Sequence, residues 1–105
     1  MNKHDKEELI EQLASVVMIN EPLEDWEKYR HGALHAYGDV KSRLENEPAK
    51  ADTLKWVNIY LDAANEYIHD KHKKLGSEHW TGYRDIMALV KSLIEQKQEG
   101  NYGQN

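Results

Sequence analysis

Apolar residues recur every three or four positions along most of the chain, and this spacing limits the possible folds more than any other feature of the sequence. A period of three to four residues is typical of α-helices that bury one face. No segment alternates between apolar and polar residues, as a half-buried strand would. The sequence therefore predicts an all-α fold.

Prolines and glycines divide this pattern into four helices, which we expect at residues 5–19, 23–46, 53–75 and 78–99. Pro22 and Pro48 separate the first three, because a proline disfavours helical geometry in the residue before it. Gly76 follows a basic stretch and is a natural end for the third helix. Short connections between the helices favour a four-helix antiparallel bundle or a close variant.

Several polar side chains stand where helix caps are needed. Asp5 is predicted to cap the first helix, with Glu8 as the second half of a capping box. Asp52 or Thr53 starts the third helix, and Ser77 caps the fourth. We expect one domain over residues 1–99, followed by a disordered polar tail at 100–105.

Composition excludes several classes of protein. The chain has no cysteine, which rules out a disulfide scaffold, a cysteine zinc site and a thiol nucleophile. No apolar run approaches the ~20 residues of a membrane-spanning helix. The charged start at residues 1–8 has no apolar stretch behind it, unlike a signal peptide. We therefore expect a cytoplasmic protein with no membrane contact.

Charge is concentrated in the first part of the chain. The formal net charge is −5, and residues 1–47 hold eleven acids against six bases. This balance disfavours direct nucleic-acid binding, which requires a basic face. It permits an acidic face that docks on a basic protein groove, to which Glu24 and Glu27 would contribute.

The second helix has glycines at unexpected positions. A helical projection places Gly32 and Gly38 beside its polar side, where His31 and His35 also lie. A glycine inside a helix costs ~1 kcal/mol relative to alanine. The helix could bend or break there, a second chain could approach closely, or the glycines could simply be tolerated at the surface.

The third helix has an aromatic shoulder beside its aliphatic stripe, formed by Trp56, Tyr60 and Tyr67. Tyr and Trp suit half-wet positions because each joins an apolar body to a polar tip. The shoulder could pack on a neighbouring helix, or it could form a dimer or partner surface. A domain this small buries only ~60–70% of its unfolded surface, which favours additional burial by association.

A histidine pair is the one candidate metal site. His31 and His35 lie one helical turn apart, and Glu27 stands four residues before His31. Two imidazoles and a carboxylate can hold a divalent metal ion. No third histidine is in register, so the leading expectation is no metal and no cofactor.

Arg30 and His35 are separated by four residues, a spacing that resembles the signature of HEPN-type ribonucleases. That family consists of small all-α domains that dimerise across the motif. The resemblance implies RNA cleavage, with His35 as general base and Arg30 stabilising charge on a phosphate. No phosphate loop, nucleophile elbow or paired carboxylate accompanies the motif, which favours a function other than catalysis.

Residues 1–10 and 29–45 resemble small proteins of phages and prophages of Gram-positive bacteria, a size class that includes anti-CRISPR inhibitors. This resemblance implies an acidic surface aimed at a host nucleic-acid enzyme. The leading hypothesis is a non-enzymatic interaction protein that forms a homodimer. The predicted partner-binding residues are Trp56, Tyr60, Tyr67, Glu24 and Glu27.

Overall fold

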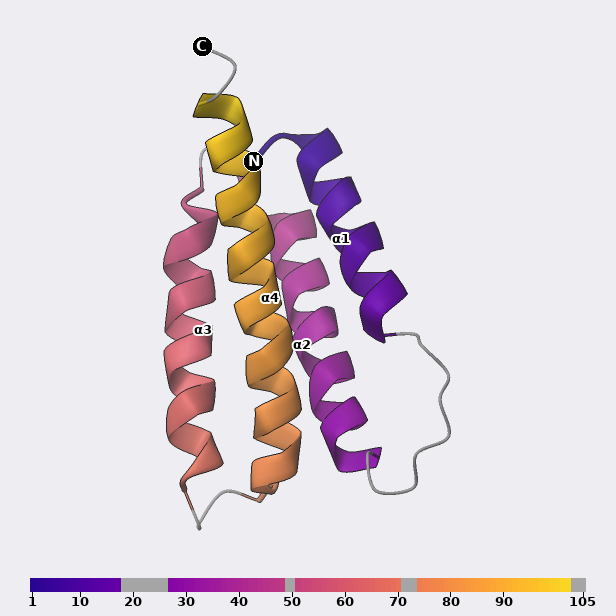
Figure 1. The fold of residues 1–105 in the computed structure, drawn as a ribbon, viewed down its shortest axis with the longest axis vertical. Coiled ribbons are helices and arrows are strands. Elements are labelled where there is room, and N and C mark those ends of the chain that lie inside the picture. Colours follow the sequence, from indigo (N-terminus) through magenta and orange to yellow (C-terminus); the bar gives the residue numbers. More distant parts are fainter. Residues whose placement is uncertain (18–26, 49–50, 71–73, 103–105) are drawn as a thin grey trace.

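A computed structural model describes residues 1–17, 27–48, 51–70 and 74–102 of the chain. Four helices form the described part, which contains no strand: α1 (Lys3–Val17), α2 (Glu27–Asn46), α3 (Thr53–Ile68) and α4 (Ser77–Tyr102). Successive helices run in opposite directions (Figure 1). The predicted all-α, antiparallel fold is confirmed. None of the described helices combines the length and the apolar character needed to cross a membrane.

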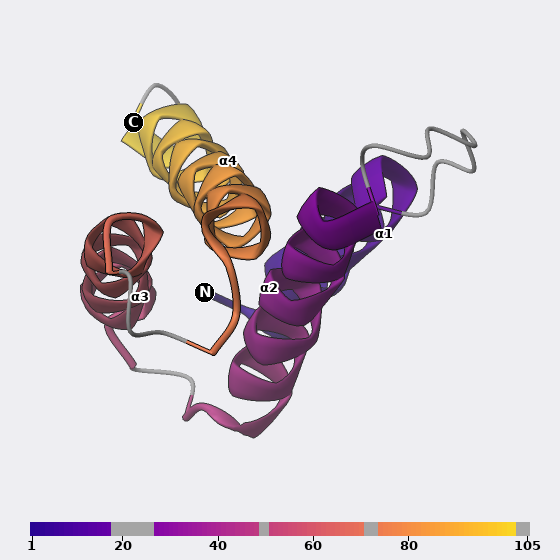
Figure 2. The same cartoon turned by 90° about the horizontal axis from the view of Figure 1, so that it is seen from below.

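The helices are not arranged as a square bundle. α2 and α4, which run in the same direction, form the most extensive helix pair. α1 packs mainly on α2, and α3 packs on α4. α2 and α3 follow each other in the chain but do not form a packed pair, and Figure 2 shows them on different sides of α4. The fold is therefore a variant of the four-helix bundle in which α2 and α4, which lie on opposite corners of a regular bundle, are in direct contact.

Two glycines allow α2 and α4 to approach so closely. A Cβ atom on Gly32 would lie 1.7 Å from the backbone oxygen of His79, and one on Gly82 would lie 2.0 Å from that of Tyr29. Each helix thus presents a glycine to the backbone of the other. The expectation that Gly32 lies beside the polar side of α2 is wrong, because Gly32 is buried against α4. The close approach at Gly32 therefore comes from another helix of the same molecule. Gly38 has open space around it, and α2 is continuous through both positions.

All four helices contribute to the core. Each large aliphatic side chain buried there contributes about 1.5–3 kcal/mol relative to an exposed one. The largest fully buried side chains are Leu9, Leu13, Val40, Leu44, Val57, Met87, Val90 and Ile94.

A buried carboxylate connects three helices at one end of the molecule. Glu47, directly after α2, has a side chain only 7% exposed and lies 3.5 Å from the Nζ of Lys6 on α1. Its Oε1 accepts a hydrogen bond from the Thr53 hydroxyl at 2.8 Å, and its Oε2 accepts one from the Trp56 indole at 2.9 Å. Both of those residues belong to α3. Glu47 therefore joins the start of α1 and the start of α3 to the end of α2.

The first helix begins earlier than expected. α1 starts at Lys3, and the Oδ1 of Asn2 accepts a hydrogen bond from the backbone N–H of Asp5 at 2.8 Å. Asn2 is therefore the capping residue, and Asp5 lies inside the helix. The predicted cap of α3 is confirmed, since Asp52 accepts from the backbone N–H of Lys55 at 3.2 Å.

The later boundaries also differ from the expected ones. α3 ends at Ile68 rather than at residue 75, because the backbone N–H of His69 bonds to Glu66 in a tight last turn. α4 begins at Ser77 and continues to Tyr102, so part of the expected tail is helical. Residues 18–19, 23–26 and 71–73 of the expected helices, and 103–105 of the expected tail, lie outside the described residues.

Candidate functional site

Five aromatic rings from α2, α3 and α4 pack against one another. We call this group the histidine–aromatic cluster: His35 from α2, Tyr67 from α3, and His79, Trp80 and Tyr83 from α4. Ring centroids of His35 lie 5.2 Å from His79 and 4.9 Å from Tyr83, and those of Tyr67 and Trp80 are 4.8 Å apart. His35 is thus part of a group of side chains from three helices.

A line of polar atoms runs through the histidine–aromatic cluster. The Nδ1 of His35 lies 3.0 Å from the Nε2 of His79, so one of the two donates a hydrogen bond to the other. On its other side, the Nε2 of His35 lies 3.5 Å from the Oδ2 of Asp39. The same oxygen accepts a hydrogen bond of 2.6 Å from the hydroxyl of Tyr83. Asp39, His35 and His79 therefore stand in sequence, with Tyr83 holding the carboxylate.

Burial shifts the pKa of two side chains in the histidine–aromatic cluster. It lowers the pKa of His79, an effect reinforced by His35 and His31 nearby. It also raises the pKa of Tyr83, with further contributions from its hydrogen bond to Asp39 and from that residue's charge. The lowered pKa of His79 favours its neutral imidazole form, in which one ring nitrogen donates a hydrogen bond and the other accepts one.

The aromatic shoulder of α3 divides into buried and half-buried residues. Trp56 is only 6% exposed and belongs to the core. Tyr60 and Tyr67 are half-buried, and the guanidinium of Arg43 on α2 lies 5.6 Å from the ring of Tyr60. The interpretation of packing within one domain thus holds for Trp56, while the two tyrosines keep part of their surface in water.

The two acidic residues predicted to bind a partner are the first residue of α2 and a residue that precedes this helix in the sequence. Glu27 is exposed as the first residue of that helix, and Glu24 lies outside the described residues. Contact of these two residues with a partner stays a prediction.

The metal site predicted from His31, His35 and Glu27 is not assembled. Within the described ranges, no group of three or more His, Cys, Asp or Glu side chains is arranged to hold a metal ion. The imidazole that contacts His35 comes from His79 on α4. Sequence reasoning missed this contact because the two residues are 44 positions apart.

Arg30 and His35 do not point to the same side of α2. The helix is continuous between them, and five residues correspond to about 140° around its axis. Both side chains are exposed. One chain does not direct both groups at a single phosphate, and the ribonuclease function inferred from this motif stays a prediction.

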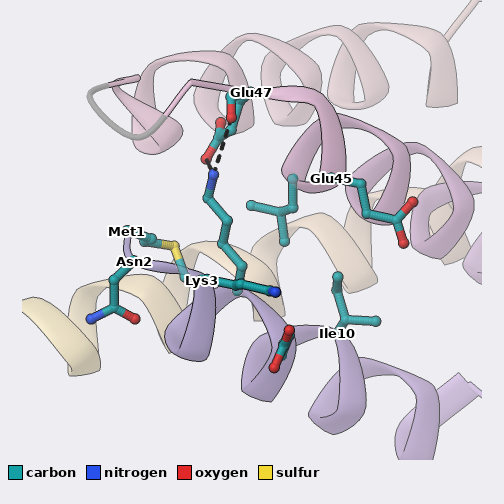
Figure 3. Close-up of a pocket in the computed structure, with 9 residues that line it drawn as sticks. Met1, Asn2, Lys3, Ile10, Glu45 and Glu47 are labelled. Atoms are coloured by element: carbon teal, nitrogen blue, oxygen red, sulfur yellow. Dashed lines mark hydrogen bonds and ion pairs between the residues drawn. The ribbon is translucent and has the colours of Figure 1, made fainter.

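A cavity lies between the start of α1 and the end of α2. Its volume of about 460 Å³ is in the range of small-molecule sites. Figure 3 shows Glu47 at this cavity together with Met1, Lys3 and Glu45. Lys6, the ion-pair partner of Glu47, also lines it. Charges of both signs line it, so its electrostatics favour neither an anion nor a cation.

Comparison with protein-family models, curated proteins and solved structures finds no match to this chain.

The contact between α2 and α4 includes a tyrosine whose pKa is raised. Tyr29 donates a hydrogen bond of 2.5 Å to Asp85, and burial together with that carboxylate raises its pKa to about 12. A phenol pKa raised above about 10 adds stability that is complete below pH 10 and is lost as the pH rises towards 12. We expect Tyr29→Phe to remove this part of the alkaline loss of stability.

Absorbance of the phenolate, followed from pH 9 to 13, checks this prediction. The Tyr29→Phe variant should lack one tyrosine that ionises in the upper part of the range. Loss of a phenolate that titrates near pH 10 would contradict the raised pKa.

Proposed function

We propose that this chain is a non-enzymatic protein-interaction module that self-associates through the outer side of α3. One observation carries the proposal. α3 has the most apolar sequence of the four helices, yet it packs on α4 alone as its main neighbour. A helix in a regular bundle has two neighbours, and a second copy of the chain would provide the missing one.

The side chains of α3 fit this role. Ile59 is 56% exposed, the largest exposed fraction among the large apolar side chains of the described residues. Tyr60 and Leu61 beside it are half-buried. Contact between two copies would remove this apolar surface from water at about 25 cal/mol per Å².

Charges on α3 favour an antiparallel pairing of two copies. Lys55 stands one turn before Ile59, whereas Asp62 and Glu66 follow it, and all three charged residues are exposed on one side of the helix. A two-fold axis near Ile59 would place the lysine of each copy opposite the acids of the other. Such complementarity sets the orientation of a pair more than its affinity.

Exposed carboxylates support the acidic-face part of the proposal. Glu7 and Glu11 on α1, and Glu27 and Glu45 on α2, are all exposed. An acidic surface of this kind suits a partner with a basic groove, such as a nucleic-acid enzyme of a phage host. The net acidic charge of α1 and the resemblance to phage proteins support this choice of partner. α2 carries four bases against three acids, so its two exposed carboxylates contribute locally and not through the net charge of the helix.

Replacement of Ile59 by lysine tests self-association. We expect the mass of the wild-type protein, measured by light scattering, to rise with concentration towards twice 12.3 kDa. The Ile59→Lys variant should stay at the monomer mass, because a charge would be buried in the contact, and its circular dichroism should be unchanged.

Val16→Lys is the matched control, since Val16 is also an exposed apolar residue, at 43%, but lies on α1. It should associate as the wild type does. A wild-type protein that stays monomeric at the highest concentration would contradict the proposal, as would equal loss of association in both variants.

A further inference from the structure

We propose that His35 and His79 together bind one divalent metal ion of the kind that prefers imidazole, such as Zn²⁺. The Nδ1 of His35 and the Nε2 of His79 face each other at 3.0 Å. Two imidazole nitrogens on a tetrahedral zinc ion, each at 2.0–2.1 Å, are about 3.3 Å apart. To reach this geometry, the two side chains must separate by a few tenths of an ångström and rotate until both lone pairs point at the ion. The proton that they share in the hydrogen bond must also leave the facing nitrogens, because only a nitrogen without its proton can bind the metal. The site does not depend on the self-association proposed above.

The groups behind His35 match those that usually support a metal-binding imidazole. Such a histidine donates its other ring N–H to a carboxylate, which fixes the tautomer and the orientation of the ring. Asp39 lies on this side of His35, with its Oδ2 3.5 Å from the Nε2, which is longer than a hydrogen bond and has to shorten when the metal binds. The Tyr83 hydroxyl donates a 2.6 Å hydrogen bond to the same carboxylate oxygen and holds it in place. With its Nε2 protonated, His35 directs the lone pair of Nδ1 towards His79.

The backbone around the pair is held in place. His35 lies one turn after Gly32. At Gly32 the backbones of α2 and α4 approach so closely that there is no room for a Cβ atom beside the backbone oxygen of His79, and this contact fixes the two helices against each other. Sites on rigid helices keep their ligands at a more precise distance than sites on loops.

The open side of the site faces solvent. The side chain of His35 is 39% exposed, so water can complete the coordination of the metal ion. His31 lies one turn before His35, but the described side chains do not form a group of three ligands. We therefore assign two protein ligands, and their imidazole nitrogens favour Zn²⁺, Ni²⁺ or Cu²⁺.

Titration calorimetry with zinc chloride tests the assignment. We expect one zinc ion per chain in the wild type, and an affinity at least about tenfold lower in His35→Ala and in His79→Gln. Asp39→Asn should weaken binding by about tenfold through its effect on His35, whereas His31→Ala should leave it within about twofold.

His4→Ala is the control. His4 is exposed and lies 3.8 Å from Glu8 on the same helix, so it forms a histidine–carboxylate pair without a second imidazole. Zinc should also shift the ring nitrogen NMR signals of His35 and His79 selectively. Absence of saturable binding, unchanged affinity in the folded His79→Gln variant, or equal loss in His4→Ala would overturn the proposal. The same titration of Ile59→Lys should give wild-type affinity, which separates this proposal from self-association.

Discussion

Replacement of Gly32 by alanine is expected to destabilise the protein by about 3 kcal/mol, although alanine is the better helix former. The added Cβ would lie 1.7 Å from the backbone oxygen of His79, and a backbone atom cannot rotate away as a side chain does. α2 and α4 would have to separate along the most extensive helix contact in the fold. Gly82→Ala should have a similar effect, since its Cβ would meet the backbone of Tyr29 at 2.0 Å.

Gly38 provides a matched control in the same helix. It has open space around it, so Gly38→Ala should stabilise the protein by about 1 kcal/mol through helix propensity alone. Urea unfolding followed by circular dichroism gives both free energies. If Gly32→Ala and Gly38→Ala changed the free energy of unfolding equally, the close contact of α2 with α4 would be wrong.

Replacement of Glu47 by alanine should cost about 3–5 kcal/mol, the range typical of breaking a buried ion pair from one side. The substitution removes the acceptor for the Trp56 indole and the Thr53 hydroxyl, and it leaves the amine of Lys6 without its carboxylate. Glu45→Ala, two residues earlier and exposed, should change stability by less than about 0.5 kcal/mol.

The Trp56 environment provides a second readout of the same variant. Loss of its hydrogen bond to Glu47 should change the tryptophan fluorescence of the folded protein in Glu47→Ala and not in Glu45→Ala. A free energy of unfolding within about 1 kcal/mol of the wild-type value would show that Glu47 does not hold α1 and α3 to α2.

The number of helices was predictable because the 3.6-residue period is a property of each helix alone, and their alternating direction was predictable from the short connections between them. The buried positions Leu13, Val40, Val57 and Val90 each lie on the apolar stripe of their own helix. The cap at Asp52 was predictable for the same reason, since it needs only three neighbouring residues. Features that depend on one segment of the chain can be inferred from that segment.

The pairing of the helices could not be inferred in this way. A helical projection assigns faces by the polarity of side chains, and Gly32 has no side chain, so its burial against α4 leaves no polarity signal. The contacts of Glu47 and His35 left no signal in the sequence because their partners Lys6 and His79 are 41 and 44 positions away. Which residues of the aromatic shoulder on α3 are buried also depends on the neighbouring helices, and of its three residues only Trp56 belongs to the core.

The outer side of α3 is the surface on which the proposed function depends, and NMR of the methyl groups across a dilution series tests it most directly. We predict that the signals of Ile59 move with concentration while those of Val16 on α1 stay fixed. Signals that are independent of concentration throughout, or that move on α1 and not on α3, would contradict self-association through α3.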